Sequence, residues 1–506
     1  MIKKRIIFSK YEKLFLLLIL LISTFLHFYL LNTHLHFNLD EGYMSFTIRN
    51  IIYLHHFPTV GPGGSIGNGI YHGAFFYYLF LIPGILSNFN PLGFAYFVVI
   101  LSIISDVLLY ISIREVYGKL VSILTVIFYV FSYNVIVYSR WEWNPNTIPF
   151  FTILSLFSLI YGIKTYKDTN NNISNDINNK ESVIEYLRKR KSLIYFSIFY
   201  FSIGAITQLH IAGWVMYPVA ILILFDTRKY IKNIRYYLIY TLSFLFPMIP
   251  TIFHELKYKF PMIKGILLFI LQHKSGNIFI SLSKGIGNYA FFINDIFKIP
   301  PEITGFLTIF GIFLIYLEIK ENKKEKINSN KKNHTYTDSD TKEMISILSK
   351  YILYILFFAY IMYSEYPGDI HHIHYAEFLF PIFPLLASLS IIFLVRLKQE
   401  FAVICLIIVS MFIYSNLILF KEGIVNGIQE YRTENIICSD IKNSIKTNTA
   451  DVNINNTINN PVYLQYICLI SYNISLNSNS LDRFIVYTNW INNTSVIQIK
   501  NTYIKR

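Results

Sequence analysis

Long apolar runs separated by short polar segments dominate the chain. A membrane-spanning helix needs about 20 mostly apolar residues, and runs of this kind recur as far as residue 420. They predict about 11 spans, near 14–32, 92–113, 120–138, 147–163, 193–208, 209–225, 236–253, 301–318, 347–363, 375–395 and 400–420. The pattern is that of an all-α polytopic membrane protein.

One further apolar stretch, 74–87, is short and is interrupted by Pro83-Gly84. We expect a re-entrant or interfacial helix there, because a spanning 74–87 would move every later loop to the other side. Lys and Arg are densest before residue 14 and in 114–119, 164–191, 226–235, 319–350 and 396–398. The positive-inside rule then places these segments in the cytoplasm and makes 33–91, 139–146, 254–299 and 364–374 outer loops.

Composition agrees with a membrane protein. Of the 506 residues, 54% are hydrophobic and only 15% are charged, against about 25% charged in soluble proteins. The net charge of +14 does not indicate nucleic-acid binding, because the basic residues cluster between apolar runs instead of forming one continuous face. The expected partner is the lipid bilayer, which is the plasma membrane in a prokaryote.

The chain changes character after the last span. Residues 421–506 alternate short β-rich runs, PVYLQYICLI and DRFIVYTNW, with turns rich in Asn and Ser. They predict a small extracytoplasmic α/β module that follows a membrane domain of residues 1–420. Cys438 and Cys468 lie in this module, either as a disulfide in an oxidising compartment or as two free buried thiols.

The first unusual polar group is Asp40-Glu41, just after the first span. Adjacent carboxylates repel each other and are costly to desolvate, so such a pair beside a membrane suggests a function. The alternative is a cap, because acids are favoured at the N-terminus of a helix such as 42–54.

The second group lies between the third and fourth spans. Tryptophans at a membrane edge ordinarily form an aromatic belt, and a Pro-Asn pair ordinarily starts the next helix. The same residue types suit sugar and phosphate recognition, because Trp stacks on rings, amides bond hydroxyls and Arg clamps phosphate. The candidates are Arg140, Glu142, Trp143, Asn144 and Asn146.

Histidines and their neighbours complete the set at the outer ends of later spans. A lone His is more often a structural hydrogen-bonding group than a ligand, and the HELKY segment lacks the second His of the HExxH zinc motif. We therefore predict no metal site, leave a divalent-cation requirement open, and expect the last histidines to donate to a phosphate. The candidates are Gln208, His210, His254, Glu255, Lys257, His371, His374 and Tyr375.

This arrangement resembles the GT-C membrane glycosyltransferases. An acidic pair in the first outer loop precedes a second polar outer loop, and a long outer loop, 254–299, follows the seventh span. The likeness is greatest to the branch of protein O-mannosyltransferases, lipid A aminoarabinose transferases and the RgtA/B/C/D-like enzymes. It extends over roughly residues 12–420.

The resemblance implies an inverting transfer from a polyprenyl- or dolichyl-phosphate sugar to an unidentified hydroxyl acceptor. Asp40 matches the family's catalytic base, and Glu41 would position it or exchange with it. Glu142 stands where relatives often have Asp, and His374 stands where many have a basic residue.

Two other functions fit parts of the pattern. A glycan polymerase or ligase would also use outer loops. A transporter of lipid-linked saccharides would place ionisable residues near the bilayer midplane. The predicted spans contain few charges apart from Asp106, which favours an enzyme with its site at the membrane surface.

Overall fold

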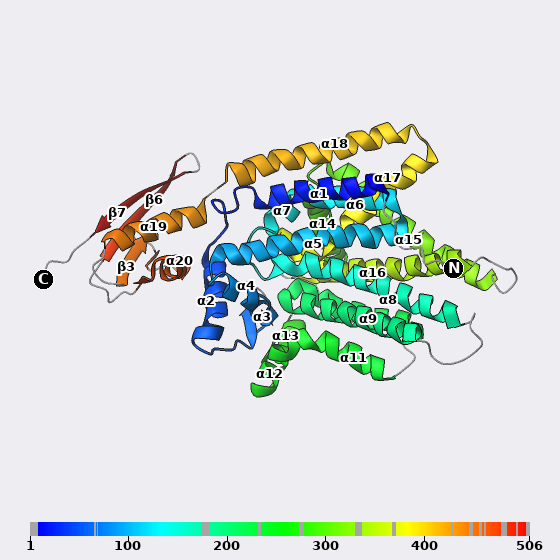
Figure 1. Cartoon of the computed structure of the whole chain (residues 1–506), viewed down its shortest axis with the longest axis horizontal. Helices are drawn as coiled ribbons and strands as arrows, with labels where there is room; N and C mark the ends of the chain where they lie inside the picture. Colours follow the sequence, from blue (N-terminus) through cyan, green and yellow to red (C-terminus); the bar gives the residue numbers. More distant parts are fainter. Residues whose placement is uncertain are drawn as a thin grey trace.

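Long helices that run side by side form the body of the protein, and shorter elements cross one end of it (Figure 1). The computed structural model describes residues 9–64, 67, 69–173, 183–230, 234–272, 278–328, 336–366, 371–427, 429–444, 449–454, 458–459, 462–476, 483–491 and 494–501. In Figure 1, α2, α3, α4 and the C-terminal elements lie at one end. That end is called the α2 end below.

Nine helices in the described ranges are long and apolar enough to cross a membrane, or ten with one bent pair. Short helical turns extend three of the nine. They are η1 (Pro145–Thr147) before α8 (Ile148–Ile173), η2 (Ile211–Val215) and η3 (Arg228–Tyr230) on either side of α10 (Met216–Thr227), and η4 (Phe246–Met248) before α12 (Ile249–Lys257). The nine are α1 (Lys10–Phe28), α5 (Pro91–Tyr117), α8 (Ile148–Ile173), α9 (Val183–Leu209), α10 (Met216–Thr227), α11 (Ile234–Leu245) continued by α12 (Ile249–Lys257), α15 (Pro301–Asn328), α16 (Tyr336–Glu365) and α18 (Phe401–Phe420).

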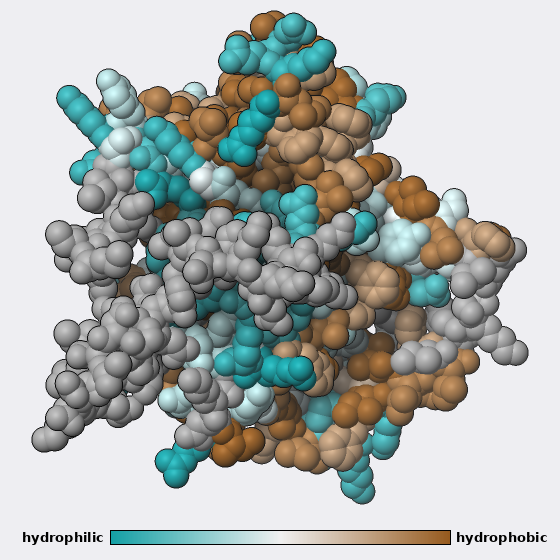
Figure 2. Space-filling model, turned by 90° about the vertical axis from the view of Figure 1, so that its right-hand side faces the viewer, coloured by the Kyte–Doolittle hydropathy of each residue, from teal (hydrophilic) through white to brown (hydrophobic). Residues whose placement is uncertain are grey.

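The surface of the bundle agrees with a bilayer as its solvent. Large apolar side chains such as Leu14, Leu18, Leu21 and Val403 are exposed on α1 and α18, which is unfavourable in water but not in lipid. Figure 2 looks onto the end opposite α2, where groups of hydrophilic side chains lie among hydrophobic ones. The protein is therefore an integral multi-pass membrane protein.

The expected span 120–138 is not one helix, so that prediction was wrong. Helix α6 (Lys119–Val130) ends before Ser132, and α7 (Tyr133–Tyr138) starts again after it. The Ser132 hydroxyl donates to the carbonyl of Ile296 at 2.9 Å, and the Tyr133 N–H donates to Asn416 Oδ1 at 2.7 Å. These long-range partners satisfy backbone and hydroxyl groups at the break, which an apolar run cannot reveal.

The expected span 375–395 is also interrupted. A 3₁₀ segment, η6 (Ile373–Leu379), meets α17 (Ile382–Leu397) at an angle of 57°. Pro381 lies at the bend, where a proline removes one backbone donor and disfavours a straight helix. The bend directs the histidines that precede η6 toward the α2 end.

The connection between α1 and α5 crosses the α2 end without spanning the membrane. It contains α2 (Leu39–Tyr53), the hairpin of β1 (Val60–Gly63) and β2 (Tyr71–Gly73), α3 (Phe75–Leu79) and α4 (Leu81–Leu86). Helices α3 and α4 are too short to cross a bilayer, as expected for 74–87. The expected loop 254–299 is largely helical, because α13 (Pro261–Gln272) and α14 (Ile278–Phe297) lie within it.

The C-terminal elements follow a π-helical turn, η7 (Lys421–Val425), and comprise α19 (Glu430–Ser444), α20 (Val462–Tyr472) and five strands. The strands are β3 (Thr449–Ile454), β4 (Ile458–Asn459), β5 (Ser475–Leu476), β6 (Arg483–Ile491) and β7 (Thr494–Asn501), with β3 parallel to β5 and β6 and antiparallel to β4, and β6 antiparallel to β7. The run PVYLQYICLI is therefore helical, not a strand. Its buried Leu464, Ile467 and Cys468 share one helical face, and this packing overrides β propensity.

Two features attach these elements to one another and to the bundle. A disulfide joins Cys438 of α19 to Cys468 of α20, which resolves the alternative left open by the sequence. The Tyr466 hydroxyl donates to the carbonyl of Phe89 at 2.7 Å, and its ring meets that of Phe46 edge-on at 4.9 Å. Helix α20 is therefore seated on α2.

Candidate active site

Helix α2 begins with a capping box. Asn38 is the N-cap, its backbone N–H donates to Glu41 Oε2 at 2.9 Å, and its own side chain accepts from a backbone N–H of the first turn. These bonds satisfy donors that every helix N-terminus leaves unpaired. The cap interpretation is therefore right for Glu41, and it leaves Asp40 in the same turn without a capping role.

A cavity of about 870 Å³ opens beside this turn. Its walls come from the α1–α2 connection, α7 and the segment after it, the histidines before η6, and the connection from α18 to α19. The lining residues include Asp40, Glu41, Arg140, Trp143 and His374 of the sequence candidates, together with His34, His36, Asn38, Tyr138, Trp141, His372, Glu422 and Glu430.

Asp40 is an exposed carboxylate of this wall, as is Glu422. In the part of the chain that the structure describes, Asp40 makes no hydrogen bond or ion pair. Its neighbour Glu41 is only 2% exposed, and burial raises the pKa of Glu41. The two adjacent acids therefore differ: Asp40 faces the cavity, whereas Glu41 is turned into the protein and bonded to the helix start.

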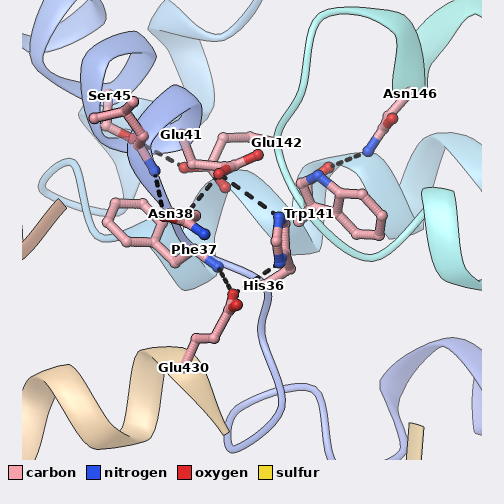
Figure 3. Close-up of polar contacts among 10 residues, drawn as sticks. His36, Phe37, Asn38, Glu41, Ser45, Trp141, Glu142, Asn146 and Glu430 are labelled. Atoms are coloured by element: carbon pink, nitrogen blue, oxygen red, sulfur yellow. Dashed lines mark hydrogen bonds and ion pairs between the residues drawn. The ribbon is translucent and has the colours of Figure 1, made fainter. Parts of the chain in front are cut away.

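Glu41 also belongs to a chain of charged groups that leads to α19 (Figure 3). His36 Nε2 lies 3.9 Å from Glu41 Oε2, and His36 Nδ1 lies 2.7 Å from Glu430 Oε2. Burial acts to lower the pKa of His36, but the hydrogen bond to Glu430 and the charges of Glu430, Glu41 and Asp40 raise it above the ordinary value.

Glu142 lies behind α2 and does not line the cavity. The Ser45 hydroxyl donates to Glu142 Oε1 at 2.9 Å, while Oε2 is buried without a partner among the described residues. Burial raises the pKa of Glu142 well above its ordinary value, and the nearby Glu41 adds to the shift. The shift favours the protonated form of Glu142, and a protonated carboxyl cannot serve as a general base.

Arg140 lines the cavity, but most of its guanidinium is already engaged. It donates to the carbonyls of Leu26, His27 and Tyr29 at 3.0, 2.6 and 2.9 Å, and these carbonyls are the unpaired groups at the C-terminal end of α1. Burial lowers the pKa of Arg140 to about 10, so the group remains charged at neutral pH. Arg140 therefore anchors α1 at the cavity wall.

Aromatic faces make up the next part of the wall. The rings of Trp143 and His374 meet edge-on at 4.7 Å, and those of Tyr138 and Trp141 lie 5.2 Å apart. The His36 ring meets Trp141 edge-on at 5.0 Å. Such surfaces suit the apolar faces of a sugar ring.

A second group of candidates lies behind this wall. His210 stacks on His72 with ring centroids 4.8 Å apart and meets His374 and Tyr375 edge-on at 5.3 and 5.1 Å. His210 also accepts the Ala212 N–H as the N-cap of η2. Gln208 accepts from the Thr251 hydroxyl at 2.8 Å. These side chains make packing contacts and hydrogen bonds within the protein and do not line the cavity.

The amides of the 139–146 segment likewise bond to backbone. Asn144 donates to the carbonyl of Leu209 at 2.5 Å, and Asn146 donates to that of Trp141 at 3.0 Å. Both bonds shape the turn that carries Trp143. The Asn146 Oδ1 atom is buried with no partner among the described atoms.

The remaining candidates stand apart from the cavity. His254 hydrogen-bonds with the Thr59 hydroxyl at 3.0 Å, and Glu255 accepts the N–H groups of Met262 and Ile263 at the start of α13. Lys257 lies over the Tyr258 ring at 5.2 Å. His371 packs on Phe291, so His372 lines the cavity instead.

Sequence reasoning missed His36 and Glu430. His36 stands four positions before Asp40, and its proximity to the acidic pair was an available signal. Glu430 had none, because it follows the last span within an ordinary polar stretch. Across the described ranges, no three His, Cys, Asp or Glu side chains lie close enough together to hold a metal ion.

No family model matches the chain, and no curated protein matches it by sequence. Solved structures do resemble it. ArnT from Cupriavidus metallidurans in the apo state gives a TM-score of 0.53 at 11% identity, covering 95% of this chain and 94% of ArnT. ArnT bound to undecaprenyl phosphate gives 0.50 at 11% identity, covering 94% and 93%.

The oligosaccharyltransferase of Archaeoglobus fulgidus, in a complex with Zn and sulfate, gives a TM-score of 0.51 at 14% identity. The match covers 86% of this chain but only 56% of the oligosaccharyltransferase, so this chain corresponds to little more than half of that protein. ArnT and oligosaccharyltransferase are both GT-C membrane glycosyltransferases. The GT-C fold expected from the sequence is thereby confirmed.

Proposed function

We propose that this protein is an inverting glycosyltransferase that moves a sugar from a polyprenyl-phosphate donor to a hydroxyl acceptor. One observation carries the proposal: the exposed carboxylate of Asp40 projects from the first turn of α2 into a large cavity at the end of a GT-C helical bundle. On the charge distribution of the sequence, this end lies outside the cytoplasm, which is the outer face of the plasma membrane in a prokaryote.

Asp40 acts as the general base in the proposed reaction. Its carboxylate takes the proton of the acceptor hydroxyl while the acceptor oxygen forms a bond to the anomeric carbon. The bond from that carbon to the phosphate oxygen breaks, and polyprenyl phosphate leaves with the electron pair. Attack opposite the leaving group inverts the anomeric centre. Glu142 is unsuited to this role because it is buried, does not line the cavity, and has a pKa raised by burial, which favours its protonated form.

The other cavity side chains would bind the substrates. Trp143 and Trp141 offer faces for the sugar ring, and Arg140 and His374 stand beside them. A developing phosphate charge is stabilised by donors already in place. A lipid-linked donor is supported by the apolar surface of the bundle and by the likeness to ArnT, one structure of which holds undecaprenyl phosphate.

The test is transfer from radiolabelled polyprenyl-phosphate sugars by purified protein, with a membrane extract as acceptor. We expect donor-dependent labelling by the wild type and loss of at least about a thousandfold in Asp40→Asn. The matched control is Glu142→Gln, which changes the other carboxylate without touching the cavity and should retain transfer. Labelling that survives in Asp40→Asn would place the base elsewhere.

A further inference from the structure

His36 is held between carboxylates of two different elements. Its Nδ1 lies 2.7 Å from Glu430 of α19, and its Nε2 lies 3.9 Å from Glu41 of α2. The His36 side chain is 43% exposed and lines the cavity beside Asp40. Figure 3 shows the imidazole between the two acids. His36 therefore links Glu430 of α19 to Glu41, the sequence neighbour of the proposed base Asp40.

Glu430 is fixed on α19 by more than this contact. The same oxygen, Oε2, accepts the Phe37 N–H at 3.1 Å, and the Tyr431 N–H donates to the Leu35 carbonyl at 3.4 Å. The residues from Leu35 to Phe37 are thus bound to the start of α19. They lead directly into Asn38, the N-cap of α2.

The protonation state of His36 decides whether this chain of contacts holds. A protonated ring donates from Nδ1 to Glu430 and attracts Glu41 from Nε2. A neutral ring that still donates from Nδ1 turns the lone pair of Nε2 toward the Glu41 carboxylate, which is repulsive. Glu41 is also the residue that closes the capping box around Asn38, so a change at its carboxylate reaches the turn that carries Asp40.

The surroundings of His36 favour the cation. The charged and titratable side chains that share the cavity wall with it are His34, Asp40, Glu41, Tyr133, Tyr138, Arg140, His372, His374, Glu422 and Glu430. Glu142 and Glu434 are buried behind this wall. Acids outnumber permanent cations here, and Arg140 already donates three hydrogen bonds to carbonyls at the end of α1.

We propose that a protonated His36 bridges Glu430 to Glu41, and that this bridge positions Asp40 for transfer. Glu430 is a positioning residue, and through it the C-terminal elements contribute to the site. The inference rests on the proposed glycosyl transfer. It adds that transfer has an alkaline limit set by the loss of the proton from His36.

The experiment is a pH profile of transfer for wild type and Glu430→Gln. The amide keeps the shape and can still accept the Phe37 N–H, but it removes the charge that favours the imidazolium. We expect transfer by Glu430→Gln to fall about tenfold or more at pH 8, because loss of the Glu430 charge lowers the pKa of His36 and so favours the neutral ring. At pH 5.5 both proteins hold the proton, and transfer should agree within about threefold.

The matched control is Asp440→Asn, which removes the same charge from the exposed side of α19 and should keep the wild-type profile. A merely structural role for Glu430 would reduce transfer equally at both pH values, and that result would overturn the proposal. If Glu430→Gln does not fold, His36→Gln replaces it. We expect His36→Gln to show low transfer, and its pH profile should lack the fall in transfer at alkaline pH.

A second readout does not depend on activity. Histidine NMR of the wild type, with the His36 signal assigned from His36→Gln, should show a pKa above 6.5 that falls in Glu430→Gln, because the hydrogen bond and charge of Glu430 raise it. An unchanged His36 titration would refute the bridge even if transfer is present. Absence of transfer in wild type and Asp440→Asn alike, with the expected titration, would count against the glycosyltransferase function instead.

Discussion

Gly42 of α2 lies directly against the backbone of Tyr463 of α20. A Cβ added at Gly42 would stand 2.8 Å from the Cα and 2.9 Å from the N of Tyr463. Both are backbone atoms, which cannot turn aside as a side chain can. The glycine therefore allows the C-terminal elements to sit on the helix that carries Asp40.

This contact makes Gly42→Ala a test of the docking. The added methyl group must push α20 away, and overpacking of this kind costs about 1–3 kcal/mol. We expect a lower melting temperature in detergent and a reduced rate of transfer. Gly305→Ala on α15 is the control, because a Cβ there meets no atom within 4 Å. Equal stability and transfer in wild type and Gly42→Ala would show that α20 is not seated on α2.

Glu142→Gln should preserve transfer and stabilise the protein at neutral pH. In the folded protein burial raises the pKa of Glu142 well above its ordinary value of 4.5, so the folded protein holds this proton to higher pH than the unfolded chain does. Ionisation then favours unfolding as the pH rises above 4.5, by up to about 1.4 kcal/mol per pH unit. The uncharged amide carries no such penalty.

The measurement is the melting temperature of wild type and Glu142→Gln from pH 4 to pH 8. The variant should match the wild type near pH 4 and exceed it increasingly toward pH 8. If the melting temperature of the variant instead falls below that of the wild type as the pH rises from 4 to 8, Glu142 is ionised and paired in the folded protein.

Arg140 has two roles that substitutions can separate. Arg140→Ala should lower stability by on the order of 3 kcal/mol, because buried carbonyls at the end of α1 lose a charged donor. It should also weaken use of the lipid donor more than use of the acceptor. Arg140→Lys keeps the charge at the cavity but cannot reproduce three directed hydrogen bonds.

Melting temperature and the KM for the donor decide between these roles. A Lys variant with a normal donor KM and a low melting temperature would mean that charge serves the donor and geometry serves α1. Donor dependence unchanged in Arg140→Ala would remove Arg140 from substrate binding and leave only its contacts with α1.

Most of the transmembrane architecture could be predicted, because apolar length is a local property of the chain. The expected span 400–420 coincides with α18, and the short stretch 74–87 forms non-spanning helices, as expected. The predictions that were wrong concern segments whose structure depends on residues far away in the sequence. The break at Ser132 depends on Ile296 and Asn416, and the helix at 462–472 depends on burial against α2.

The candidate site could be predicted only in part. Asp40 was found because two adjacent acids are unusual beside a membrane, and Trp143 because a Trp among Arg and amide side chains suits stacking on a sugar ring. The amides, Gln208 and the histidines at 210 and 254 were chosen for the same polarity, but they bond to backbone groups or to threonine hydroxyls. A polar residue at a membrane edge has many such partners, and its sequence does not say which of them it meets.

The sequence by itself determined the class of the protein, since the free energy of placing apolar runs in lipid depends on composition and length alone. It also determined that acids, amides and aromatic residues gather at the ends of the spans. Only the tertiary structure decided which of them share a cavity. It left Asp40 exposed in the cavity and buried Glu41 beside it, and it brought Glu430 to His36 across 394 positions. Hydrogen bonds and ion pairs act over a few ångströms, so they follow the packing of the chain rather than its order.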